Sequence, residues 1–131
     1  MKTLITILAC CVAVAVAFKP HCPNTKEITP EHRNYVRNQL VSRVTVVEKI
    51  PRALGYTEYK ITYDHDYEKW AQVYNHYRRP SIPMHESCGS KLEVGKSYLV
   101  GYNGQFYFVR DLDTITEKER GLLGFDPKKD M

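Results

Sequence analysis

Two alternating runs around Asn103-Gly104 constrain the fold of this chain more than any other feature. The runs cover residues 96–102 and 105–109, and together they are rich in tyrosine, phenylalanine and valine. Such residues favour strands, and an Asn-Gly pair between two strands is typical of a two-residue type I′ hairpin turn. The sequence therefore predicts an antiparallel hairpin in which both turn residues have positive φ.

Three further segments have the composition or alternation of strands: residues 40–47, 56–63 and, more weakly, 71–77. Pro51 and Gly55 predict a turn between the first two segments. Pro80 and Pro83 predict that residues 78–87 form a loop, because proline interrupts regular structure.

Helix signals stand near both ends of the chain. Residues 29–31 combine an N-cap threonine, a proline and an acidic residue, which predicts a short helix to about Asn38. Thr116 and Glu119 form a capping-box pattern, and Gly124 is a suitable helix terminator. Five strands flanked by short helices predict an all-β fold, a closed five-stranded β-barrel of OB type. Closure would also remove exposed strand edges.

The first seventeen residues predict a cleaved signal peptide. Lys2 precedes an apolar run over residues 4–14, and Ala15-Val16-Ala17 supplies small residues for cleavage before Phe18. The apolar run is shorter than the roughly 20 residues that span a bilayer, which disfavours an uncleaved anchor. We therefore expect a secreted, extracellular protein whose domain covers residues 18–131, with no membrane span.

Length and charge exclude several classes of protein. Removing 17 of 131 residues leaves 114, which suits one domain with a modest core. Lys2 leaves with the leader, so 18 basic and 15 acidic residues remain, a net charge of +3. These charges are interspersed, whereas a nucleic-acid-binding protein gathers its lysines and arginines on one face. We expect a monomer that does not bind nucleic acid.

The cysteines predict one disulfide. Cys10 and Cys11 leave with the leader, and Cys22 and Cys88 remain in an oxidising compartment. A chain-entropy model gives about 4 kcal/mol for such a long loop. A zinc site is the competing interpretation. It is disfavoured because neither cysteine lies in a C-x-x-C pattern, and because His21, next to Cys22, would point the other way on a strand.

Enzyme chemistry has little support in the sequence. No motif of a hydrolase, a zinc protease or a phosphate-binding loop is present. The cluster Asp64-His65-Asp66 is the one tempting group, but its polar surroundings predict a turn after a strand. We expect no enzymatic activity, no cofactor and no intrinsic metal site.

Residues 87–101 carry a resemblance to a known family. They contain Cys-Gly, then Leu-x-Val-Gly, then Lys-x-Tyr-Leu, and in this they resemble the netrin-like (NTR) domain of tissue inhibitors of metalloproteinases. Residues 108–118 also look like that family's last strand, bend and final helix, and residues 40–47 fit its first strand. The resemblance covers nearly all of the mature chain and implies a five-stranded OB-type barrel.

The resemblance also implies a site at the amino terminus. The family's first cysteine, here Cys22, is bridged to the cysteine of the Cys-Gly motif, here Cys88. A second family disulfide would join positions that hold Asn24 and Arg110, so it is absent. In that family the free amine and carbonyl of the first cysteine chelate the protease zinc, and the next side chain, here Pro23, enters the specificity pocket.

These correspondences imply a secreted inhibitor that binds an extracellular metalloendopeptidase. Cleavage before Phe18, however, leaves four residues ahead of Cys22, so the Cys22 nitrogen is an amide and a poor ligand. A chain trimmed to begin at Cys22 would regain the amine. The alternative is a non-inhibitory NTR binding module for a matrix, receptor or other extracellular partner.

Overall fold

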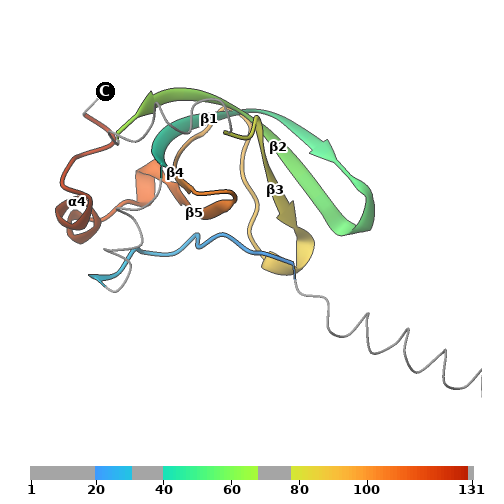
Figure 1. Cartoon of the computed structure of the whole chain (residues 1–131), viewed down its shortest axis with the longest axis horizontal. Coiled ribbons are helices and arrows are strands. Elements are labelled where there is room, and N and C mark those ends of the chain that lie inside the picture. The colour runs from blue at the N-terminus through green and yellow to red at the C-terminus, as the bar shows by residue number, and fades with distance from the viewer. Residues whose placement is uncertain (1–19, 31–39, 68–77, 130–131) are drawn as a thin grey trace, which may run out of the picture.

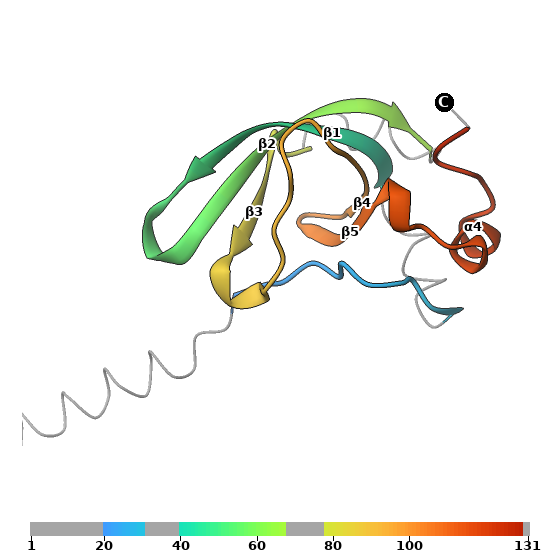
Figure 2. The ribbon, with the colours of Figure 1, turned by 180° about the vertical axis from the view of Figure 1, so that it is seen from behind.

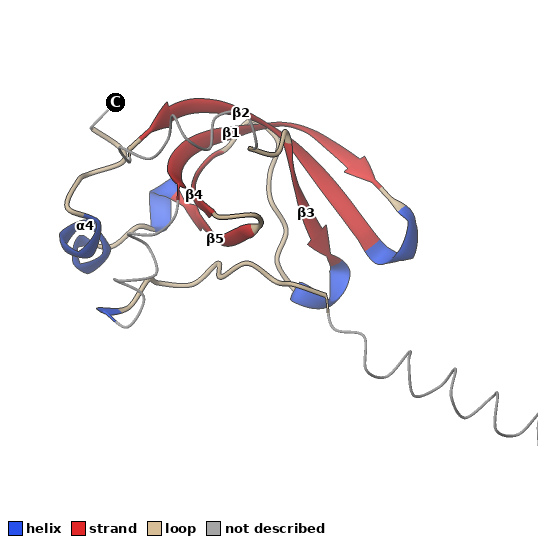
Figure 3. Ribbon diagram, viewed as in Figure 1, coloured by secondary structure: helices blue, strands red, loops and turns tan. Residues whose placement is uncertain are grey.

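A computed structural model describes residues 20–30, 40–67 and 78–129 (Figure 1). Its elements, in chain order, are β1 (Leu40–Pro51), η2 (Ala53–Gly55), β2 (Tyr56–Asp66), β3 (Ser81–His85), η3 (Glu86–Cys88), β4 (Ser97–Tyr102), β5 (Phe106–Asp111), η4 (Leu112–Thr114) and α4 (Glu117–Leu123). The η elements are short 3-10 turns (Figure 3). The predicted signal peptide, most of the predicted helix over 29–38 and the predicted strand over 71–77 lie outside the described residues.

The five strands form one antiparallel sheet in the order β3-β2-β1-β4-β5. The sheet curls into a half-barrel, with α4 at one end and the hairpin between β1 and β2 at the other (Figures 1 and 2). This confirms the predicted all-β fold of five strands. It also fits the OB class, whose five-stranded barrels are partly open.

The predicted closure of the barrel is wrong: β3 and β5 remain the two edges of the sheet, and another segment occupies the edge of β5. Asn24 pairs in parallel with β5: its N–H donates to the Tyr107 carbonyl (2.8 Å), and its carbonyl accepts from the Val109 N–H (2.9 Å). Residues 20–30 pass beneath β5 on the open side of the half-barrel (Figure 2). The edge of β5 that faces Asn24 is therefore not free to pair with β3.

The structure corrects the prediction of a loop over residues 78–87, because β3 lies within it. The Ile61 N–H donates to the Pro80 carbonyl (3.0 Å), and Pro83 stands opposite Glu58 in the register. Hydrogen-bonding positions alternate along an antiparallel pair, so Pro83 occupies a position that faces away from β2. Proline is tolerated there because β3 is an edge strand and no ladder bond is lost.

The turn predicted at Asp64-His65-Asp66 is also wrong, since these residues lie in β2. Hydroxyl groups on β1 explain how the carboxylates fit in a strand. Ser42 Oγ donates to Asp66 Oδ1 and Thr45 Oγ1 donates to Asp64 Oδ2, both at 2.6 Å. Each carboxylate thus finds a partner across the sheet, which a polar stretch read in isolation does not reveal.

The predicted hairpin is confirmed as β4 and β5, but its turn differs from type I′. Gly104 has φ +78°, whereas Asn103 does not have positive φ. Three residues connect the paired Tyr102 and Phe106, and the register shifts between Gly101 and Tyr102. The connection is therefore one residue longer than a two-residue turn, and of Asn103 and Gly104 only the glycine has the left-handed conformation.

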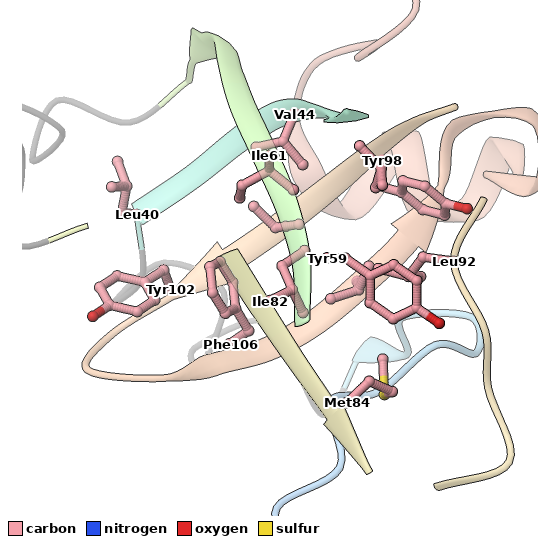
Figure 4. Packing of buried hydrophobic residues seen from close by; sticks show 13 residues of the cluster. Leu40, Val44, Tyr59, Ile61, Ile82, Met84, Leu92, Tyr98, Tyr102 and Phe106 are labelled. Carbon is pink, nitrogen blue, oxygen red and sulfur yellow. The ribbon is translucent and has the colours of Figure 1, made fainter. Parts of the chain in front are cut away.

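Strand alternation sorts the apolar side chains onto two faces. Tyr98, Val100 and Tyr102 of β4 belong to one buried cluster with Tyr59 and residues from the other strands. Figure 4 shows Tyr98, Tyr102 and Tyr59 in this cluster. The intervening Leu99 belongs to a second cluster on the opposite face, which also contains Ile28, Val41, Phe108 and Leu112. The alternation explains how one curled sheet builds both cores.

Candidate functional site

The predicted disulfide is present and joins two segments that are distant in sequence. Cys22 and Cys88 are 66 residues apart, with an S–S distance of 2.06 Å and a Cα–Cα distance of 5.5 Å. Cys88 ends η3, so the bond ties the N-terminal segment to the turn that follows β3. Cys22 is exposed and Cys88 is half-buried. The covalent link therefore joins the segment that pairs with the edge strand β5 to the turn after the other edge strand, β3.

Further contacts hold the residues on both sides of Cys22. His21 Nε2 donates to the Phe106 carbonyl (2.7 Å), and its ring meets Tyr107 edge-on with centroids 5.7 Å apart. Pro23 is buried, and Asn24 is paired with β5. Residues 21–24 therefore lie in a defined conformation in which the Pro23 ring faces the protein.

The tip of the β1–β2 hairpin presents an unusual apolar residue. Leu54 is 88% exposed and has φ +61° and ψ +30°, and Gly55 follows with φ +78°. A left-handed conformation costs a residue with a side chain about 1–2 kcal/mol. The backbone is nevertheless held, because the Arg52 N–H donates to the Tyr56 carbonyl (2.8 Å). The tip thus projects a leucine into solvent from a strained backbone.

His85 connects this tip to η3. Its Nε2 donates to the Leu54 carbonyl (2.9 Å), and its Nδ1 accepts from the Ser87 N–H (3.1 Å). The Tyr56 ring packs edge-on against the His85 ring at 4.8 Å. The hairpin tip and η3 lie at the same end of the molecule (Figures 1 and 2), and η3 carries Cys88, so His85 and the disulfide link the tip to the N-terminal segment. We call residues 21–24, 52–56 and 85–88 the ridge.

A buried ion pair anchors the other end of the N-terminal segment. Arg110 Nε donates to Glu119 Oε2 (2.8 Å) and Arg110 Nη2 to Glu119 Oε1 (2.5 Å), with Arg110 6% exposed and Glu119 fully buried. Arg110 Nη1 also donates to the Thr25 carbonyl (2.8 Å), and the Ile28 N–H donates to Glu119 Oε2 (3.1 Å). Asn24 and Arg110 occupy the positions of the absent second disulfide. There the N-terminal segment is held by the backbone pairing of Asn24 and by the hydrogen bonds of Arg110 instead.

The predicted capping box of α4 is part of the same network. Thr116 Oγ1 accepts from the Glu119 N–H, and Glu119 Oε1 accepts from the Thr116 N–H, both at 3.2 Å. Burial alone would raise the pKa of Glu119. The hydrogen bonds from Arg110 and from the Ile28 and Thr116 N–H groups outweigh burial and lower that pKa, so the side chain is a carboxylate at neutral pH.

The cluster Asp64-His65-Asp66 does not assemble into a site. Asp64 is bonded to Thr45, while Asp66 pairs with Arg78 at 2.7 Å. The His65 ring packs against Tyr67 with centroids 4.6 Å apart. Across residues 20–30, 40–67 and 78–129, no three histidine, cysteine or acidic side chains lie together as metal ligands would.

Sequence reasoning located part of the ridge and missed the rest. Cys22 and Cys88 were predicted from cysteine count and from the resemblance. Leu54 and His85 were missed, because nothing local marks an exposed leucine or a histidine that joins two turns. Gly55 did indicate a turn at this place, which is the one signal that pointed to the tip.

Comparison with known proteins bears on the fold alone. Neither a protein-family profile nor a curated protein sequence matches this chain. Among solved structures, excretory-secretory protein 2 of Ancylostoma ceylanicum is similar, with a TM-score of 0.51 and 21% identity. The match covers 81% of this chain and 99% of that chain. It supports an NTR-like fold, as residues 87–101 predicted, and does not extend to the inhibitors of metalloproteinases.

In the part of the chain that the structure describes, no helix is both long and apolar enough to cross a bilayer.

Proposed function

We propose that this chain is a secreted NTR-like binding module that recognises an extracellular protein through the ridge. The observation that carries the proposal is the joining of Leu54, His85 and the Cys22–Cys88 disulfide into one braced, exposed surface. Bracing lowers the conformational entropy that binding would otherwise cost. An exposed leucine held at an energetic cost is best explained by a partner that contacts it.

The proposed partner contact does not use Pro23 as a wedge. Its ring is buried in the described conformation, and Asn24 is bonded to β5 on the following side. In a chain that begins at Phe18, the Cys22 nitrogen is an amide whose lone pair is delocalised. These features favour recognition by the tip and η3 over chelation of a metal.

A matched pair of substitutions tests the module. Leu54→Asn removes the apolar side chain and suits positive φ, so the fold should be retained. Val94→Asn is the control, since Val94 is also apolar and 57% exposed but lies outside the ridge. Binding of the mature protein is measured by biolayer interferometry against extracellular metalloendopeptidase domains with blocked active sites and against matrix proteins.

We expect Leu54→Asn to weaken binding about tenfold, as loss of a central apolar anchor does, and Val94→Asn to leave binding nearly unchanged. Equal losses in both variants, or no binding by the native protein to any of these partners, would contradict recognition through the ridge.

A second candidate function is inhibition of an extracellular metalloendopeptidase after trimming to Cys22. It is favoured by one observation: the disulfide holds the exposed Cys22 at one end of the ridge. A trimmed chain would offer a free amine beside a carbonyl, which together form a bidentate zinc ligand. The disulfide would hold both groups in place and so reduce the ordering cost of chelation.

Titration of one zinc endopeptidase with two forms of the protein tests this function. The form that begins at Phe18 should inhibit weakly or not at all, and the form that begins at Cys22 should inhibit better. The trimmed form with an acetylated amino terminus is the control, because it differs only in the loss of the amine. Equal inhibition by the acetylated and free forms would rule out terminal chelation.

A further inference from the structure

A basic hollow of about 420 Å³ lies where β1, β4, η4 and the C-terminal tail meet, and it shares no residue with the ridge. Its charged lining comes from four separate segments: Arg43 of β1, Lys96 before β4, Asp113 of η4 and Lys128 of the tail. Three cations thus face the hollow with one carboxylate, and the carboxylate of Asp111 pairs with Lys96, so a net excess of one positive charge remains. This excess of positive charge makes the hollow suitable for an anion.

Arg43 lacks the counter-charge that a half-buried guanidinium requires. Its Nη1 donates to the Pro127 carbonyl (3.2 Å), and its Nε is buried without a hydrogen-bond partner. No carboxylate among the described residues pairs with it, whereas Arg52, Arg78 and Arg110 each have one. Burial of a charge without a partner is costly, so an external anion near Arg43 would stabilise the protein.

The two lysines differ in how firmly they are paired. Lys96 Nζ lies 2.5 Å from Asp111 Oδ2, a pair that is mostly shielded from solvent. Lys128 Nζ lies 3.2 Å from Asp113 Oδ1, and both side chains are more than half exposed. An exposed pair of this kind is weak, so an anion can compete with Asp113 for Lys128.

We propose that the hollow binds one sulfate-type oxyanion, with Arg43 and Lys128 as its principal charged contacts. A guanidinium and an ammonium group both donate hydrogen bonds to oxyanion oxygens, and charge-assisted bonds of this type are the strong ones. Asp113 opposes the anion and limits its affinity. The oxyanion is either a free inorganic ion or a sulfate ester on a sugar, and both present the same oxygens.

The test measures binding of sodium sulfate to the mature protein by NMR titration, at constant ionic strength maintained with chloride. Lys128→Gln removes a proposed contact, and Asp113→Asn removes the opposing charge. Lys129→Gln is the matched control, because Lys129 is exposed and adjacent but does not line the hollow. A sulfated disaccharide and its unsulfated form are then compared with the inorganic ion.

We expect Lys128→Gln to weaken sulfate binding about threefold and Asp113→Asn to strengthen it by a similar factor, as single exposed charges do. Lys129→Gln should have a much smaller effect. If the sulfated disaccharide binds more tightly than inorganic sulfate and the three variants change its affinity in the same way, the oxyanion is assigned to a glycan. If it binds more weakly than inorganic sulfate, the oxyanion is assigned to a free ion. Absence of sulfate binding, or equal effects of Lys128→Gln and Lys129→Gln, would overturn the proposal.

Discussion

Glu119→Leu should lower the free energy of unfolding by about 3–5 kcal/mol, the loss typical of breaking a buried ion pair. The substitution leaves the Arg110 guanidinium buried without its counter-charge, and it removes the acceptor for the Ile28 N–H. Equilibrium unfolding in urea measures the effect. The side chain is fully buried, so solvent cannot replace the lost partner.

A double variant separates the charge effect from simple loss of packing. Arg110→Met together with Glu119→Leu removes both charges and should be clearly more stable than Glu119→Leu alone. Recovery will be incomplete, because the Thr25 carbonyl and the capping box also lose partners. A double variant no more stable than the single one would show that uncompensated charge is not the cause.

Acid should lower the unfolding free energy of the native protein through protonation of Glu119. Folding lowers the pKa of Glu119, so its contribution is fully present above the ordinary glutamate pKa of about 4.3. The contribution is lost as the pH falls through the lower pKa of the folded state. We therefore expect the loss of stability below about pH 4 to be smaller in the Arg110→Met/Glu119→Leu variant than in the native protein.

Removal of the disulfide is the second change with a large expected effect. Cys22→Ala with Cys88→Ala opens a loop whose ends are 66 residues apart, and it should cost about 2–5 kcal/mol of unfolding free energy. Replacing both cysteines avoids a free thiol. Urea unfolding of this variant and of the reduced native protein should agree. An unfolding free energy equal to that of the oxidised native protein would contradict a stabilising role.

Loss of the disulfide should act most strongly on one end of the N-terminal segment. Hydrogen exchange of the Asn24 amide, which donates to the Tyr107 carbonyl, is expected to accelerate, whereas the Ile28 amide, bonded to Glu119, should remain protected until global unfolding. The disulfide and the hydrogen bond from Ile28 to Glu119 lie at opposite ends of the segment, so loss of the first should not release the second. Equal acceleration at both amides would show instead that the segment is released as one unit.

Features that depend on neighbouring residues were predicted well. The Thr116–Glu119 capping box and the β4–β5 hairpin both arise from side chains within a few residues of one another. The Cys22–Cys88 disulfide was predicted from a different constraint, the expectation that Cys10 and Cys11 leave with the leader and that the two remaining cysteines pair in an oxidising compartment. Composition and local spacing were sufficient for these elements.

Pro83 and the two aspartates of β2 were predicted wrongly, because their structure depends on which strands lie beside them. Pro83 indicated a loop, yet it lies in β3, because a proline is harmless on the outer side of an edge strand. Whether a strand is an edge is a property of the strand order. The same holds for Asp64 and Asp66, which are acceptable in β2 because β1 places hydroxyl groups opposite them.

The sequence by itself determined three features: strands, from the alternation of apolar and polar residues; the capping of α4; and the pairing of the cysteines. Only the tertiary structure decided that Asn24 pairs with the edge of β5, that His85 binds the Leu54 carbonyl and that Glu119 is the partner of Arg110. The physical reason is that strand periodicity and helix capping are interactions between near neighbours. The ion pair, the ridge and the covering of β5 depend on segments that meet only after the sheet has curled.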